Sequence, residues 1–325
     1  MPGRTVAKLA TVSAVIAASV LAVAPTAHAD LVTHCIGTGG AVTVPNDLLV
    51  PAGQSCALTG TTITGNVTVA AGGNLVVTGG RVSGEVRVAA DGYLDATETT
   101  VDGQVVLAAG GYGIFLKDAR TGTVTVKPKG TTTIDSFLFA EASTVTGHVN
   151  VSAGEVRLDQ GTQVQRNLSS TGTYYTDLHD SFVDGTLSVL NSATGSVVCG
   201  SAVQGRATFA GNLGGVQLGP NGNLDSCASG GYWGGDVSVT STTGGVTVDD
   251  NIINGQLTVT SNDPAAQVAA NNRIRGGVTG EQAAATTNRV ARVAGPDRED
   301  AGDQRAEVRR TSAVQEATEA GAARL

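Results

Sequence analysis

Four polar side chains within eight residues form the best candidate for chemistry in this sequence: Asp177, His179, Asp180 and Asp184. A carboxylate beside an imidazole can orient it as a general base, and the same side chains are common metal ligands. The alternative is a polar turn between two strands, which favours the same residue types. No nucleophile motif, metal-binding helix or phosphate-binding loop accompanies the cluster. We therefore favour the turn and predict no catalytic residue, no metal site and no cofactor.

The elements that would position these residues belong to a repeat. The heptapeptide ITGNVTV, which begins at Ile63, recurs about every twenty residues, and self-similarity at such a period indicates a solenoid. Counted from the third residue of each copy, which we call the anchor, the intervals are 19, 19, 19, 25, 19, 19, 20, 30, 20 and 21 residues. The later copies are VSGEVRV at Val82, VDGQVVL at Val101, RTGTVTV at Arg120, VTGHVNV at Val145, VQRNLSS at Val164, VDGTLSV at Val183, VQGRATF at Val203, WGGDVSV at Trp233, INGQLTV at Ile253 and IRGGVTG at Ile274.

Alternation within each copy predicts which side chains face the interior. The residues two before, two after and four after the anchor are aliphatic in almost every copy, as in Ile63, Val67 and Val69, and polar residues stand between them. A second aliphatic segment follows each copy, and the glycines between the segments mark tight corners. We predict an all-β, single-domain parallel β-helix, or β-solenoid, of about eleven rungs. A right-handed coil is favoured, although the spacing of Ile63, Val69, Leu75 and Val82 also approaches a left-handed hexapeptide coil.

The repeat weighs against a second candidate site, the aromatic pair Tyr232 and Trp233. The pair follows the glycine-rich segment 211–231, and aromatic rings can stack against sugars. Trp233, however, occupies the same position in its copy as Ile253 and Val203. We therefore expect it to fill the core, with a ligand-binding loop as the alternative.

A row of small hydroxyl side chains is expected on an outer face. The position three after the anchor is mostly Ser or Thr, whereas no two adjacent rungs place carboxylates just after the anchor. Such a row is typical of a solvated or binding face and not of acid–base catalysis. Its members are Thr68, Arg87, Val106, Thr125, Asn150, Ser169, Ser188, Thr208, Ser238 and Thr258.

The four cysteines predict two disulfides, which indicates an oxidising compartment. Cys199 lies six residues before one anchor and Cys227 eight before the next, so the two stand at nearly equivalent positions on adjacent rungs. Rungs stack about 4.8 Å apart, within the reach of a disulfide. Cys35 and Cys56 then pair by elimination, near the end of the solenoid that needs a cap.

The first 29 residues are typical of a signal peptide. Arg4 and Lys8 precede the apolar run 9–24, and Ala27-His28-Ala29 fits the cleavage rule. A retained anchor is the alternative, but the run is short for a membrane span. No second long apolar stretch follows, so we expect an extracellular protein without a transmembrane anchor after cleavage. The excess of 28 acidic over 20 basic residues speaks against nucleic acid as a partner.

The sequence divides into four parts. After the signal peptide (1–29), residues 30–62 are expected to form an N-terminal cap and the first strands, and residues 63–280 the solenoid. Residues 281–325 lack the alternation and are rich in Ala, Arg and Glu. We expect a low-order charged tail, disordered or marginally helical and dispensable for the fold, with a cap over Val278 as the alternative.

The rung pattern V-x-G-x-V-x-V resembles that of bactofilin-type parallel β-helices. The segment VPAGQSCALTGTTITGNVTV, from Val50 to Val69, resembles a group of secreted actinobacterial repeat proteins. The resemblance covers about residues 31–280 and implies a fold but no activity. We expect a secreted structural or binding module whose partner is a glycan or a cell-envelope component. The alternative is a polysaccharide lyase or glycoside hydrolase with a site at one of the long rungs, which a groove collecting carboxylates beside a basic residue would favour.

Overall fold

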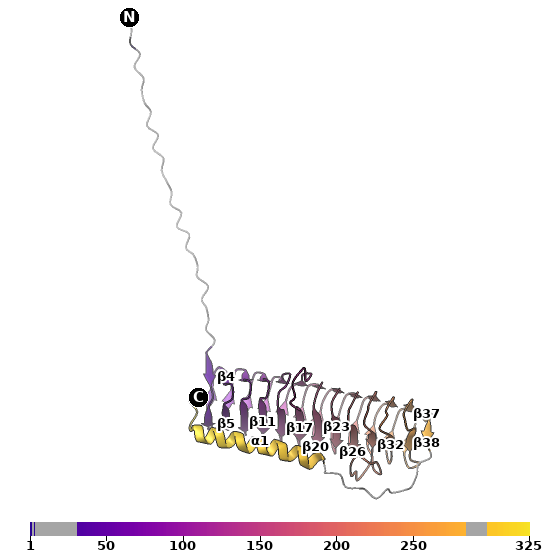
Figure 1. Cartoon of the computed structure of the whole chain (residues 1–325). Helices are drawn as coiled ribbons and strands as arrows, with labels where there is room; N and C mark the ends of the chain where they lie inside the picture. Colours follow the sequence, from indigo (N-terminus) through magenta and orange to yellow (C-terminus); the bar gives the residue numbers. More distant parts are fainter. Residues whose placement is uncertain (2, 4–30, 284–297) are drawn as a thin grey trace. The chain divides into compact units, whose positions relative to one another are not determined.

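Each rung makes three short strands, and every strand pairs in parallel with its equivalent one rung along the chain (Figure 1). The computed structural model describes Met1, Gly3 and residues 31–283 and 298–325, so the signal-peptide prediction lies outside the described residues. The strands form two 13-stranded sheets and one 12-stranded sheet, here called sheets A, B and C. The predicted all-β parallel β-solenoid is confirmed.

Sheet A contains the strand that follows each anchor. Its strands are β1 (Val32–His34), β4 (Asp47–Val50), β7 (Val67–Val69), β10 (Val86–Val88), β13 (Val105–Leu107), β16 (Val124–Val126), β19 (Val149–Val151), β22 (Leu168–Thr171), β25 (Leu187–Leu190), β28 (Ala207–Ala210), β31 (Val237–Thr240), β34 (Leu257–Thr260) and β37 (Val278–Gly280).

Sheet B contains the second aliphatic segment of each rung. Its strands are β2 (Gly37–Gly39), β5 (Ser55–Thr59), β8 (Asn74–Thr78), β11 (Tyr93–Thr97), β14 (Gly113–Lys117), β17 (Phe137–Glu141), β20 (Glu155–Asp159), β23 (Tyr175–His179), β26 (Gly195–Cys199), β29 (Val216–Leu218), β32 (Val246–Val248), β35 (Ala266–Val268) and β38 (Gln282–Ala283).

Sheet C contains the two-residue strand before each anchor. Its strands are β3 (Thr43–Val44), β6 (Thr62–Ile63), β9 (Arg81–Val82), β12 (Thr100–Val101), β15 (Arg120–Thr121), β18 (Thr144–Val145), β21 (Gln163–Val164), β24 (Phe182–Val183), β27 (Ala202–Val203), β30 (Tyr232–Trp233), β33 (Ile252–Ile253) and β36 (Arg273–Ile274).

The core is one continuous column of aliphatic side chains inside the three sheets. The predicted inward positions are buried, as Val82, Val86 and Val88 show, each at most 2 % exposed. Because strands are in register, each side chain stacks on its equivalent in the next rung; Val105, for example, lies between Val86 and Val124. Small branched side chains fill such a narrow interior without voids.

Glycine occupies nearly every anchor, with Arg166 as an exception, and neighbouring rungs approach closely at this corner. A Cβ added at Gly103 would lie 2.5 Å from the carbonyl oxygen of Gly84, the anchor one rung earlier. A second corner, between sheets B and C, needs positive φ. It is occupied by Gly79 (φ 64°) in one rung and by Glu98 (φ 49°) in the next.

Sheet C has twelve strands, one more than the eleven repeats found in the sequence. The additional strand is β3, whose Val44 stacks on Ile63, and Leu48 and Val50 of the same rung stack on Val67 and Val69. This rung has Asn46 at the anchor and lies within residues 30–62, which were expected to form the cap and the first strands. Its three aliphatic positions were nevertheless readable, so part of the predicted cap is a complete rung.

Both predicted disulfides are present, Cys35–Cys56 with a Cα separation of 5.6 Å and Cys199–Cys227 with 5.4 Å. The register argument for the second pair was wrong. In β26 and β29 the residue opposite Val198 is Leu218, and Cys227 lies well beyond it in the inserted segment 219–231. The insertion folds back over sheet B and brings Cys227 to Cys199.

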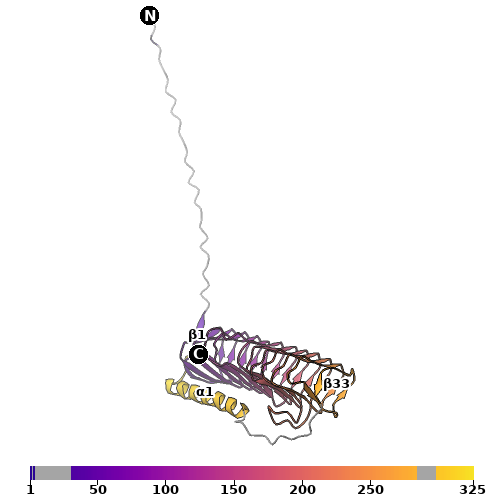
Figure 2. The ribbon, with the colours of Figure 1, turned by 45° about the vertical axis from the view of Figure 1, so that its right-hand side comes forward.

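Residues 298–320 of the tail form helix α1 (Arg298–Ala320), so the tail takes the helical form of the two that were expected. The helical alternative holds, but the helix lies against β2, β5 and β8 of sheet B and not over Val278 (Figures 1 and 2). Within the described residues, no helix has an apolar stretch long enough to span a membrane.

The residues after α1 pair with the exposed edge of sheet B. Gly321, with φ 84°, ends the helix, and its carbonyl oxygen accepts a 2.8 Å hydrogen bond from the Thr38 amide. The Ala323 amide donates a 2.8 Å hydrogen bond to the Thr38 carbonyl. Chain 321–323 therefore covers β2, the first strand of this sheet, and protects an edge that would otherwise be open to pairing.

Substitutions at adjacent positions of one rung test the inward and outward faces. Val105 is fully buried between valines, so Val105→Asp should lower the free energy of unfolding by about 3 kcal/mol or more, because an unpaired charge would enter the apolar column. Gln104 is exposed and its side chain donates a hydrogen bond to the Glu85 carboxylate, so Gln104→Asn should change the free energy of unfolding by less than about 0.5 kcal/mol. Urea unfolding followed by circular dichroism measures both. Equal losses would mean that the two faces are assigned in reverse.

Candidate functional site

The outer surface of sheet B carries an aromatic cluster, which is unusual in a chain with 3 % aromatic residues. Strand alternation turns Leu94, Ile114 and Leu138 inward and leaves aromatic residues on the outer face. Phe137 and Phe139 stack with ring centroids 4.5 Å apart. The cluster comprises Tyr93, Tyr112, Phe115, Phe137 and Phe139. Five of the eleven aromatic residues thus lie between positions 93 and 139, a signal that the sequence reasoning missed.

Helix α1 covers this cluster with small side chains. Ala306 is 4 % exposed and packs against the rings. A Cβ at Gly302 would lie 2.9 Å from the Phe139 ring, so only glycine fits that contact without a shift. Ala313 and Ala317 are also buried, whereas Val308 on the helix is 63 % exposed. The helix therefore contributes methyl groups and backbone to the interface rather than large apolar side chains.

Four arginines hold the helix on the sheet. Arg305 Nη2 lies 2.5 Å from Glu155 Oε2, and its guanidinium lies 5.3 Å from the centroid of Phe137. Arg309 Nε donates a 2.7 Å hydrogen bond to Asn74 Oδ1, and the same guanidinium lies over the Tyr112 ring.

From the sheet, Arg157 donates to Asp303 on the helix and lies 4.7 Å from the centroid of Phe139. Arg310 Nε lies 3.7 Å from Asp95 Oδ2. Cation–π contacts and ion pairs thus replace the apolar face that a docked helix normally provides.

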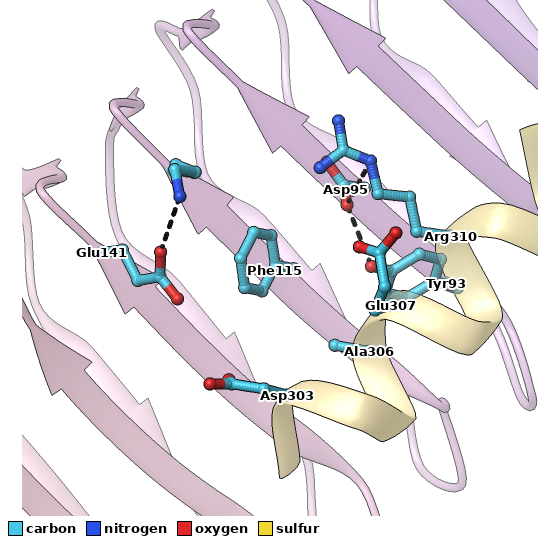
Figure 3. A pocket seen from close by; sticks show the side chains of 9 residues that line it. Tyr93, Asp95, Phe115, Glu141, Asp303, Ala306, Glu307 and Arg310 are labelled. Atoms are coloured by element: carbon cyan, nitrogen blue, oxygen red, sulfur yellow. Dashed lines mark hydrogen bonds and ion pairs between the residues drawn. The ribbon is translucent and has the colours of Figure 1, made fainter. Parts of the chain in front are cut away.

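A pocket of about 190 Å³ remains between the helix and the sheet (Figure 3). Its lining residues are Tyr93, Asp95, Phe115, Lys117, Glu141, Asp303, Ala306, Glu307 and Arg310. Lys117 Nζ lies 3.1 Å from Glu141 Oε2, and this hydrogen bond raises the pKa of Lys117. The pocket thus collects carboxylates beside basic residues, but Glu141 and Asp95 each already have a basic partner.

Asp95 is a fully buried carboxyl in this pocket. Burial raises its pKa above the usual 3.8, although Arg310 and hydrogen bonds from the Tyr93 and Thr97 hydroxyls oppose the shift. Burial likewise raises the pKa of the Tyr93 hydroxyl, which donates to Asp95 over 3.0 Å. A buried carboxyl of this kind can hold a proton or accept hydrogen bonds, and here its neighbours use it to tie the helix to the sheet.

The residues of the cluster Asp177, His179, Asp180 and Asp184 have different surroundings in the structure. Asp177 is fully buried on the outer side of β23 and accepts a 2.9 Å hydrogen bond from the Val197 amide. Asp180 is a corner residue with φ 46°, opposite Gly200 in the next rung, a conformation that aspartate tolerates well. Asp184 accepts a 2.7 Å hydrogen bond from Gln163.

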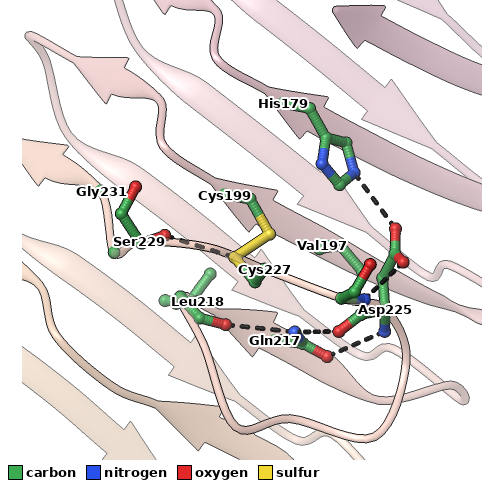
Figure 4. The surroundings of a disulfide bond; sticks show 12 residues. His179, Val197, Cys199, Gln217, Leu218, Asp225, Cys227, Ser229 and Gly231 are labelled. Atoms are coloured by element: carbon green, nitrogen blue, oxygen red, sulfur yellow. Dashed lines mark hydrogen bonds and ion pairs between the residues drawn. A yellow bond between two sulfur atoms is a disulfide. The ribbon is translucent and has the colours of Figure 1, made fainter.

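His179 faces a residue that the sequence did not suggest. Its Nε2 lies 3.4 Å from Asp225 Oδ2, which belongs to the inserted segment 219–231 (Figure 4). Gln217, buried beneath this segment, accepts hydrogen bonds from the Leu224 and Asp225 amides and donates to the Asp225 carbonyl. Together with the Cys199–Cys227 disulfide, these bonds hold the segment on sheet B. His179 and Asp225 thus help to hold this loop on sheet B, and Asp177 and His179 themselves lie in β23.

The pair Tyr232 and Trp233 does not form a joint binding surface. Trp233 is fully buried, contacts Phe209 edge to face and donates a 2.9 Å hydrogen bond to Asn251 Oδ1. Tyr232 points outward and is 37 % exposed. Trp233 is thus no part of a ligand loop, because successive side chains of a strand point to opposite faces.

In the described part of the chain, no group of three or more His, Cys, Asp or Glu side chains is arranged to hold a metal ion. Comparison of the chain with protein-family models, with curated proteins and with solved structures gave no match.

Removing the helix tests how much it stabilises the solenoid. A protein ending at residue 283 should keep its strand signal but lose a contribution of about 2–3 kcal/mol, which lowers the thermal midpoint by about 5–10 °C. The uncovered cluster should also bind the dye ANS. Val308→Gln, at an exposed helix position, is the control and should change neither the thermal midpoint nor the binding of ANS. A midpoint within about 3 °C of the full chain would restore the view that the tail is dispensable.

Asp95→Asn tests the effect of burial on the carboxyl. The pKa of Asp95 in the folded state lies above the usual 3.8, so the folded state binds the proton more tightly than the unfolded state does. The resulting stability is fully present below pH 3.8 and is lost as the pH rises through the raised pKa. The free energy of unfolding of the wild type minus that of the variant should therefore fall as pH increases from 3.8. Urea unfolding of both proteins over a pH series measures it. A difference that grows with pH would show that Arg310 outweighs burial.

Proposed function

We propose that this protein is an exported, rigid β-solenoid that acts as a structural or binding module outside the cell, with a glycan or a cell-envelope component as partner. The two disulfides support an oxidising location. The N-terminal sequence, with its basic residues, apolar run and small-residue cleavage site, supports export.

The observation that carries the proposal is the row of hydroxyl side chains on the outside of sheet A. Six of them stand in register on successive rungs and remain partly or fully exposed. Adjacent members lie about 4.8 Å apart, as neighbouring strands do. They are Ser169, Ser188, Thr208, Ser238, Thr258 and Thr279. A straight line of donors and acceptors on a stiff support suits an extended polymer or the surface of an envelope component better than a small molecule.

Catalysis is the less supported alternative. Asp95 and Glu141 do converge with Lys117 in the pocket under α1, as a lyase or hydrolase would need. Arg310 pairs with Asp95, and Lys117 with Glu141, and both carboxylates are nearly inaccessible to solvent. These contacts favour a helix-docking network. The resemblance to bactofilin-type β-helices supports the rung pattern alone, since those filaments are cytosolic and lack disulfides.

Export and binding can be tested together. The full chain, expressed in a secreting host, should appear in the medium without residues 1–29 and without free thiols, which N-terminal sequencing and thiol labelling measure. A pull-down with insoluble polysaccharides and purified cell walls should retain it, and chromatography of the polymers should detect no shortened product. Retention inside the cell with reduced cysteines would contradict export, and release of oligosaccharides would establish the enzyme alternative.

A further inference from the structure

The outer row of sheet C changes character halfway along the solenoid. In the first seven strands this row is polar: Thr43, Thr62, Arg81, Thr100, Arg120, Thr144 and Gln163. The next four strands carry Phe182, Ala202, Tyr232 and Ile252, in register on adjacent rungs, which we call the apolar row. Phe182 is 48 %, Tyr232 37 % and Ile252 40 % exposed. Single exposed apolar residues need no explanation, but an aligned row indicates an interaction site.

The spacing of the two rings suits an extended sugar chain. Phe182 and Tyr232 stand two rungs apart, a distance of about 10 Å along the solenoid axis, because neighbouring strands are 4.7–4.9 Å apart. This approximates the repeat of two pyranose units in an extended chain. The Tyr232 hydroxyl accepts a 2.7 Å hydrogen bond from Asn254 Nδ2, which fixes the position of the ring before a ligand arrives.

A polar row runs beside the apolar row, two residues further along the chain in each rung and just after the strand of sheet C. It consists of Asp184, Gln204, Gly234, Asn254 and Arg275. At Gly234 a Cβ would lie 2.3 Å from the Gln204 carbonyl oxygen, so this rung presents no side chain next to Tyr232. Asp184, beside Phe182, accepts a hydrogen bond from Gln163, and the other side chains of the row are the Gln204 and Asn254 amides and the Arg275 guanidinium. An aromatic ring beside such groups can bind the apolar face and the hydroxyls of a sugar.

The apolar row ends at a hollow of about 430 Å³ lined by Ile252, Arg273, Ile274 and Arg275. Both arginines are exposed, and neither forms an ion pair within the described ranges 31–283 and 298–325. The chain carries a net charge of −8, so two neighbouring arginines with no acidic partner among the described residues stand out against an acidic background. A guanidinium without a partner matches a carboxylate on a ligand.

We propose that the apolar row, the polar row beside it and the hollow form a binding site for an acidic polysaccharide that contains uronate units. The polymer lies along the solenoid axis, with pyranose faces on Phe182 and Tyr232 and carboxylates toward Arg273 and Arg275. This inference rests on the proposed function as a binding module and names the ligand class and the face. A second copy of the chain is a poorer occupant, because four side chains are far fewer than the 20–30 residues a side of a standard interface.

Binding is tested on the full chain with polygalacturonate, alginate and hyaluronan as probes, and with fully methyl-esterified polygalacturonate as the uncharged match. Isothermal titration and affinity gel electrophoresis measure Kd at two salt concentrations. We expect at least one of the acidic polymers to bind, and the ester to bind at least about tenfold more weakly, since guanidinium–carboxylate contacts are the strong ones.

Variants separate this face from the rest of the molecule. Phe182→Thr and Tyr232→Thr introduce the residue found on the polar half of the same row and should each raise Kd at least about tenfold. Arg273→Gln and Arg275→Gln should raise Kd and reduce its dependence on salt. Arg120→Gln, in the same outer row but far from the hollow, is the matched control and should bind as the wild type. Circular dichroism confirms that each variant is folded.

Three results would overturn the inference. The first is no binding of any of the three acidic polymers. The second is a Kd that Arg120→Gln raises as much as Arg275→Gln does, or that Phe182→Thr and Tyr232→Thr leave unchanged. The third is a dimer in sedimentation that Phe182→Thr dissociates, which would make the row a contact between copies. If the wild type and the variants bind equally well to cell walls or neutral polysaccharides, the proposed function stands and only this site is ruled out. If the protein stays inside the cell with reduced cysteines, the proposed function itself is ruled out.

Discussion

The parallel, in-register stacking of rungs is the constraint on which the rest of the structure depends. Each strand can bond its neighbours only if the backbones approach to strand distance at every corner, which is why the anchor is glycine at positions such as Gly103. In-register stacking also places equivalent side chains of successive rungs directly on top of one another. A residue type that suits one rung must suit its neighbours, so the interior is built mainly of valine and leucine, and an outer row can keep one chemical character over several successive rungs.

In-register stacking also leaves surfaces and strand edges that other segments of the chain must cover. A stacked sheet with aromatic outer rows exposes apolar surface over several rungs, and its first strand exposes unpaired backbone groups. Here the C-terminal segment meets both needs, since α1 covers the cluster around Phe139 and chain 321–323 pairs with β2. Further along, the disulfide-bound segment 219–231 covers the outer face of sheet B near His179. Sheets A and C keep their repeated outer rows accessible, and those rows are the surfaces on which the functional proposals rest.

The docking of α1 shows how a polar helix can bind an aromatic surface. Alanines and a glycine bring the helix backbone close to the rings, and arginines reach over the ring faces to acidic partners such as Glu155. Removing one partner of such a pair leaves the other charge without compensation, so the interface is sensitive to the loss of either partner. This explains why the carboxylates under the helix serve attachment, although their convergence resembles that of a catalytic groove.

Local pattern alone determined the rung period, the inward positions and the all-β class, because alternation and glycine spacing act between residues close in the chain. The rung at Val44, whose anchor is Asn46, was not counted, because residues 30–62 were assigned to the N-terminal cap and the first strands. The partner of His179, the cover over Phe139 and the route that brings Cys227 to Cys199 were decided only by the tertiary structure. Each of these depends on where a helix or an insertion lies after folding, and Asp303 and Arg157 meet although nearly 150 residues separate them. No periodicity encodes such a contact, because it arises from the complementary surfaces of two finished elements.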